Sequence, residues 1–145
     1  TIWFNGANQG LVKRINFPDK IIVSIPSDIL SKKKDINPFI AKRIKTNNFD
    51  CISLKKIKYY EDKVGHNRLT TGCYSIMWAL DNFKYVYIHG FDFFINSKGH
   101  YFDNKLIKSL KNKNIIKKGD KHNNKLEKKF IIDLIKNKTI NKLIY

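Results

Sequence analysis

The sequence predicts an α/β domain built on a mainly parallel sheet. Short apolar runs alternate along the chain with segments of helical spacing, which is the pattern of such domains. The run Lys20–Ile25 is continuous and β-branched, as strands buried on both faces are. The chain has 145 residues, of which 42% are apolar, enough for one packed core. We therefore expect a single domain spanning residues 1–145.

The predicted strands are short runs that end at turn-forming residues. The first strand ends at an Asn-Gly loop, and the second ends before Pro26. The chain begins almost inside its first strand, so we expect an N-terminally truncated domain that lacks an upstream strand and loop. The five expected strands are Thr1–Asn5, Lys20–Ile25, Phe49–Leu54, Tyr85–Ile88 and Ile140–Tyr145.

Helices are predicted where apolar residues recur every three or four positions. Ser27 and Asp28 are expected to cap one helix. Thr70 or Thr71 is expected to cap the apolar helix that begins at Gly72. The segment from Lys55 to Asn67 is interpreted as polar and irregular. The expected helices are Pro38–Lys45, Gly72–Asn82, Lys105–Lys111 and an amphipathic one carrying Leu126, Phe130, Ile131, Leu134 and Ile135.

The charge is strongly positive, because 29 Lys and Arg residues outnumber 12 Asp and Glu to give +17. Such a charge suits nucleic acid, an anionic lipid surface or a phosphate-bearing substrate. The lysines are scattered and arginines are few, which argues against a specific nucleic-acid reader. A basic nucleic-acid-binding α/β module nevertheless remains the alternative from another functional class.

Two further features bear on the compartment. Cys51 and Cys73 lie in apolar runs without a second ligand pair, so we expect small core residues in a reducing compartment and no zinc site. No apolar run approaches the roughly 20 residues that span a bilayer, and we expect no signal peptide. The expected location is cytoplasmic, either soluble or peripheral to the inner face of a membrane.

Several polar groups follow the ends of predicted strands, where parallel sheets bind ligands. They are Asn5, Pro26-Ser27, Gly90–Asp92 and the loop leading to His100. Thr70-Thr-Gly72 at a helix start offers backbone N–H groups and the positive end of the helix dipole to an anion. An ordinary helix cap explains the same three residues.

The histidines offer proton-transfer chemistry. His100 and Tyr101 could donate hydrogen bonds to an anionic leaving group, although a surface loop with aromatic anchors explains them equally well. His122 lies at the start of the last helix, where it could accept a proton or simply be exposed to solvent. Glu127 follows in the first turns, where a carboxylate stabilises a helix start. His66 and His89 are weaker candidates, and His89 is expected to be buried in its strand.

Taken together, these segments resemble the sialyltransferases in order, spacing and residue type. Thr70–Leu80 with Val86–Asp92 is similar to the small sialylmotif of glycosyltransferase family 29. Gly99–Asp103 resembles the short third motif of that family, and His122 with Glu127 matches its very small His-x-x-x-x-Glu motif. The bacterial family 42 enzymes share arrangements similar to Arg68–Gly72 and Gly90–Phe93, but Phe94 stands where they have a phosphate-binding Tyr.

The resemblance implies a Rossmann-like fold of the GT-A-like type and inverting transfer of sialic acid, or a related sugar acid, from a CMP-activated donor. The acceptor would be a glycan or glycolipid hydroxyl, no metal is expected, and the chain could also be an inactive relative. In that reading His122 is the catalytic base, and His100 with Tyr101 binds the departing phosphate. The nucleotide and donor contacts would be Asn5, Arg68, Thr71, Gly72 and Gly90.

Overall fold

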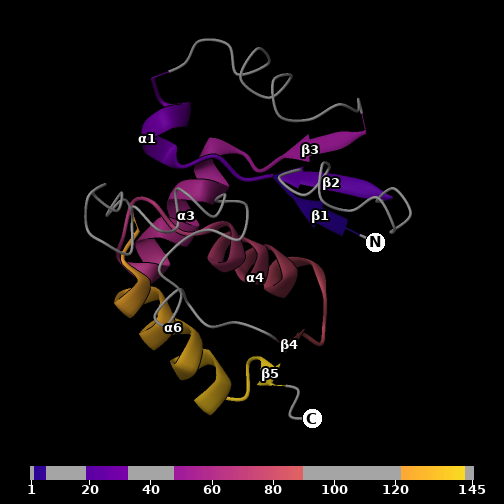
Figure 1. Cartoon of the computed structure of the whole chain (residues 1–145), viewed down its shortest axis with the longest axis vertical. Coiled ribbons are helices and arrows are strands. Elements are labelled where there is room, and N and C mark those ends of the chain that lie inside the picture. The colour runs from indigo at the N-terminus through magenta and orange to yellow at the C-terminus, as the bar shows by residue number, and fades with distance from the viewer. Residues whose placement is uncertain (1, 6–18, 33–47, 90–121, 143–145) are drawn as a thin grey trace, which may run out of the picture. The chain divides into compact units, whose positions relative to one another are not determined.

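The computed structural model describes residues 2–5, 19–32, 48–89 and 122–142 (Figure 1). The chain divides into two compact units, Thr1–Met77 and Trp78–Tyr145. The expected helices Pro38–Lys45 and Lys105–Lys111 lie outside the described residues.

The first unit contains a parallel sheet, and this confirms the predicted α/β class. Its strands are β1 (Ile2–Phe4), β2 (Lys20–Val23) and β3 (Phe49–Cys51), in the order β1-β2-β3 (Figure 1). Trp3 pairs with Ile21, which pairs in turn with Phe49 on the other side. All three strands therefore direct their carboxyl ends to the same edge of the sheet.

The middle strand supplies the core of this unit. Ile21, Val23 and Ile25 are buried together, and Trp3, Ile29, Leu30 and Phe49 pack against them. Ile22 and Ser24, which alternate with them, are buried as well. Burial of successive residues explains why the run is apolar without alternation.

The short helix α1 (Ser27–Leu30) follows β2 directly. The prediction that Ser27 and Asp28 cap this helix is wrong, because Pro26 occupies the cap position and makes no side-chain hydrogen bond. Proline has no N–H group to satisfy there, and its fixed φ suits the entry into a helix.

The segment predicted to be irregular is instead the helix α3 (Leu54–Val64). Its side chains Ile57, Tyr60 and Val64 are buried at helical spacing, so the helix has an apolar stripe between exposed lysines. The side chain of Ser53 caps its start by accepting from the N–H of Lys56 at 3.3 Å. Gly65 ends it in the left-handed conformation, with φ at 81°.

The predicted apolar helix is confirmed as α4 (Thr71–Asn82), with Cys73, Tyr74, Ile76 and Met77 buried. Thr70 is its cap, because its Oγ1 accepts from the N–H of Cys73 at 3.2 Å. Burial of Cys73 matches the prediction of a core cysteine. The same prediction is wrong for Cys51, which is exposed at the end of β3, a strand that has a neighbour on one side only in the described sheet.

The second unit contains the predicted amphipathic helix and a small parallel pair of strands. The helix is α6 (Asn124–Lys136), and the strands are β4 (Tyr87–Ile88) and β5 (Asn141–Lys142). Its buried apolar residues include Val86, Ile88, Ile131 and Ile140. His89 is exposed just beyond β4, so the expectation that it is buried in a strand is wrong.

Across the described parts of both units, no helix is long and apolar enough to cross a membrane.

Candidate active site

Asn5 joins the ends of two strands to the start of a helix. It follows β1 directly and continues the ladder, because its N–H donates to the carbonyl of Ile22 at 2.9 Å. Its φ is 58°, in the left-handed region that asparagine tolerates better than most residues. The side-chain Oδ1 accepts from the N–H of Ser24 at 2.7 Å and from its Oγ at 3.3 Å, while Nδ2 donates to Oγ1 of Thr71 at 3.0 Å.

Two of the predicted site residues are therefore in direct contact, Asn5 and Thr71. Asn5 is near the beginning of the first unit in the sequence, and Thr71 is near its end. The side-chain amide of Asn5 donates to Thr71 and accepts from Ser24, so both of its polar atoms are hydrogen-bonded. Gly72 follows Thr71 in the first turn of α4. The three residues lie at the carboxyl edge of the sheet, where α/β folds of this kind bind their ligands.

The start of α4 has the chemistry of an anion site. Its cap residue Thr70 accepts from the N–H groups of Cys73, through Oγ1, and of Tyr74, through its carbonyl at 3.1 Å. The N–H groups of Thr71 and Gly72 come earlier in the turn, where a helix provides no acceptor of its own. Together with the positive end of the helix dipole, they can bind a phosphate or carboxylate oxygen.

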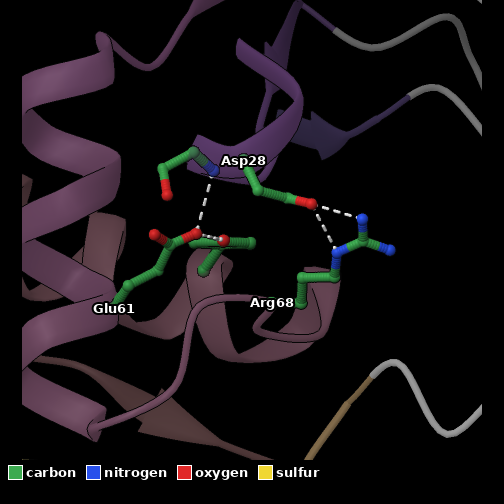
Figure 2. Close-up of polar contacts among 5 residues, drawn as sticks. Asp28, Glu61 and Arg68 are labelled. Atoms are coloured by element: carbon green, nitrogen blue, oxygen red, sulfur yellow. Dashed lines mark hydrogen bonds and ion pairs between the residues drawn. The ribbon is translucent and has the colours of Figure 1, made fainter. Parts of the chain in front are cut away.

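Arg68, another predicted donor contact, is bound within the protein. Its Nε donates to Oδ2 of Asp28 at 2.9 Å, and its terminal nitrogen contacts the same oxygen (Figure 2). Hydrogen bonding to Asp28 raises the pKa of the guanidinium. The other carboxylate oxygen of Asp28 is buried and has no hydrogen-bond partner among the described residues. In this structure, the charge of Arg68 is directed toward Asp28.

The predicted base lies in the second unit. His122 is exposed and immediately precedes Asn123, whose side chain caps α6 by accepting from the N–H of Leu126 at 3.1 Å. The histidine is therefore outside the helix, as the sequence suggested. Glu127 is in the first turn but only 1% exposed, so this carboxylate also belongs to the interior of the second unit.

The remaining predicted site residues, His100, Tyr101 and Gly90, lie outside the described residues. Within residues 2–5, 19–32, 48–89 and 122–142, no three His, Cys, Asp or Glu side chains gather as a metal site would require.

Comparison with known families decides what kind of protein carries this arrangement. The family model described as glycosyltransferase family 29 (sialyltransferase) matches residues 20–139, which is well over half of the chain. The chain belongs to glycosyltransferase family 29. The match in this family 29 chain includes Arg68, Thr71, Gly72 and His122, whereas Asn5 precedes it. Searches of curated proteins and of solved structures gave no significant match.

Three residues that hydrogen-bond within or beside this arrangement were not predicted as site residues from the sequence. Ser24 is the one polar residue in the run Ile21–Ile25, and this is a usable signal of a side-chain role. Glu61 lies on the apolar face of α3, between Ile57 and Val64, where a charge is unusual. Asp28 gave no such signal, because its partner Arg68 lies 40 positions away in the sequence.

Proposed function

We propose that this chain is an inverting sialyltransferase that moves sialic acid, or a related sugar acid, from a CMP-activated donor to a glycan hydroxyl. Family membership supports the transfer of a sugar. The hydrogen bond between Asn5 and Thr71 is the observation that supports the proposed position of the nucleotide site. The fold would be the GT-A-like variant of a Rossmann-like domain, with the nucleotide at the carboxyl edge of β1 and β2.

The nucleotide site would be formed by Asn5 and the first turn of α4. Thr71 and Gly72 would present backbone N–H groups to the donor's phosphate, and Gly90 would allow a close approach of the backbone. Asn5 would position this turn and offer its amide to the nucleotide. Arg68 would act near the donor's anionic groups, with its orientation set by Asp28.

The transfer would be a single displacement at the anomeric carbon. His122 would take the proton of the acceptor hydroxyl, whose oxygen forms the new bond as the bond to the CMP phosphate breaks. His100 and Tyr101 would donate hydrogen bonds to the departing phosphate. These donors and the backbone N–H groups would supply the positive potential, so the proposal requires no metal ion.

Exposure of His122 ahead of the α6 cap supports its role, because an acceptor hydroxyl can reach it. Turnover of CMP-sialic acid tests this step. We expect His122→Ala to lower kcat by roughly 100-fold or more. His66→Ala, a histidine outside the proposed machinery, serves as the control. Equal rates for wild type and His122→Ala would remove His122 from the mechanism.

We also propose a cytoplasmic enzyme that makes peripheral contact with an anionic membrane, where a glycolipid acceptor would lie. The charge of +17 supports this placement, since basic residues are attracted to anionic lipid. Flotation with phosphatidylserine vesicles at low and at physiological salt tests the contact. If the chain binds the vesicles at neither salt concentration, the proposed membrane contact is wrong.

A further inference from the structure

Glu61 is a buried carboxylate in the last turn of α3. It is 2% exposed, although an acidic side chain is costly to bury unless it is paired or hydrogen-bonded. Its Oε1 accepts from the backbone N–H of Ser27 at 3.0 Å and from the hydroxyl of Tyr74 at 2.6 Å (Figure 2). The carboxylate thus connects three helices of the first unit.

The two donors to Glu61 belong to the same two segments that Asn5 connects. Asn5 binds Ser24 and Thr71, and Glu61 binds the residues three positions further along each segment, Ser27 and Tyr74. The end of β2 and the start of α4 are therefore connected twice by hydrogen bonds, through Asn5 and through Glu61. One connection is at the candidate site, through Asn5, and the other is at the buried carboxylate of Glu61.

Glu61 also acts where local capping is missing. Pro26 provides no side-chain acceptor at the start of α1, so the N–H of Ser27 would lack a partner without this carboxylate. The backbone carbonyl of Glu61 in turn accepts from the N–H groups of Gly65, at 2.7 Å, and His66, at 3.1 Å. Those bonds close the end of α3, from which the chain continues to Arg68 and α4.

We propose that Glu61 is a positioning residue for sugar transfer, which fixes the Ser24–Ser27 segment against the first turn of α4 and so sets the geometry at which Asn5 and Thr71 meet the nucleotide. This inference rests on the proposed function. It adds a residue that touches neither donor nor acceptor and acts through Ser27 and Tyr74.

The test compares four variants of the full chain by two measurements. The affinity for CMP is measured by calorimetry, and amide hydrogen exchange is measured at Ser24 and Ser27. Glu61→Leu removes both acceptor bonds, Glu61→Gln keeps an acceptor oxygen, and Tyr74→Phe removes one bond only. Ile57→Val is the matched control, because it perturbs a fully buried residue of the same helix outside the network.

We expect Glu61→Leu to weaken CMP binding about tenfold. A change of this size is typical of the interaction energies between neighbouring residues of one hydrogen-bond network. Tyr74→Phe should give a smaller loss, and Glu61→Gln should restore most of the affinity. The Ser24 and Ser27 amides should exchange faster in Glu61→Leu but not in Ile57→Val. If Glu61→Leu does not fold, the comparison of Glu61→Gln, Tyr74→Phe and the control still applies.

Two results would overturn the inference. One is wild-type CMP affinity in Glu61→Leu and Tyr74→Phe, and the other is an equal loss of affinity in Ile57→Val. If the wild-type chain itself does not bind CMP, the proposed function fails, and the exchange measurement decides the inference alone. Faster exchange at Ser24 in Glu61→Leu but not in Ile57→Val would then support positioning, whereas unchanged exchange would refute it.

Discussion

The side-chain amide of Asn5 donates a hydrogen bond to the hydroxyl of Thr71 at 3.0 Å, across 66 positions of the sequence. The oxygen of the same amide receives the N–H of Ser24 at 2.7 Å. One side chain therefore fixes the end of β1, the end of β2 and the start of α4 with respect to one another.

Asn5 should contribute through both its backbone and its side chain. Asn5→Ala loses three side-chain hydrogen bonds and places alanine in the left-handed region, so we expect a loss of about 2–4 kcal/mol in unfolding free energy. Asn5→Gly loses the same bonds but tolerates the backbone, and it should be about 1 kcal/mol more stable than Asn5→Ala. Urea denaturation measures both. Equal stability of the two variants would contradict the role assigned to φ.

The contact between Arg68 and Asp28 should act as one unit. We expect Arg68→Met and Asp28→Ala each to lower the urea midpoint. The double variant should lose less stability than the sum of the losses in the two single variants. The control is the ion pair of Lys20 with Asp50, which lies at 2.5 Å but is more exposed. Its removal should change the midpoint little. Strictly additive losses for Arg68 and Asp28 would show that they act independently.

Tyr74 should make stability fall in alkaline solution. Burial, and then the hydrogen bond to Glu61, raises the pKa of its hydroxyl above the ordinary value of 10.0. Above that pH the unfolded chain loses this proton while the folded chain keeps it, so the unfolding free energy decreases as pH rises. The stability difference between wild type and Tyr74→Phe should be constant below about pH 9 and shrink above about pH 10. Denaturation at several pH values checks this, and a constant difference throughout would contradict it.

Glycine should be the more stable residue at two helix ends. Gly65 and Lys138 both have positive φ, 81° and 56°, after α3 and α6. Gly65→Ala should lower the unfolding free energy by about 1 kcal/mol, and Lys138→Gly should raise it by a similar amount. Lys138→Ala is the control, because it removes the charge without relieving the backbone. If Lys138→Ala stabilises the protein as much as Lys138→Gly, charge and not conformation is the cause.

The sequence identifies those elements whose pattern is local. The β-branched run of β2 is continuous because both faces of the strand are buried, and the start of α4 is visible from the Thr-Thr-Gly cap. Residue types and order were also sufficient to relate Thr71, Gly72 and His122 to family 29. Asn5 was placed from its position after a strand, and the structure brings it into contact with Thr71.

The sequence interpretation failed where composition concealed a pattern. Lysines and acidic residues dominate α3, yet Ile57, Tyr60 and Val64 form a buried stripe between Ser53 and Gly65, which are recognisable helix-end residues. The contact of Arg68 with Asp28 and the two bonds to Glu61 join segments that are distant along the chain. Their pairing depends on which loops the tertiary fold brings together, so no local pattern could reveal it.

Binding of CMP to the full chain tests the central claim most directly. We predict a measurable calorimetric signal for wild type and an affinity about tenfold weaker for Thr71→Val, which keeps the shape of the side chain but loses the acceptor for Asn5. Thr139→Val, the same change at an exposed residue between α6 and β5, should bind as wild type does. Absence of CMP binding by wild type, or equal affinities for all three proteins, would contradict a nucleotide site at Asn5 and Thr71.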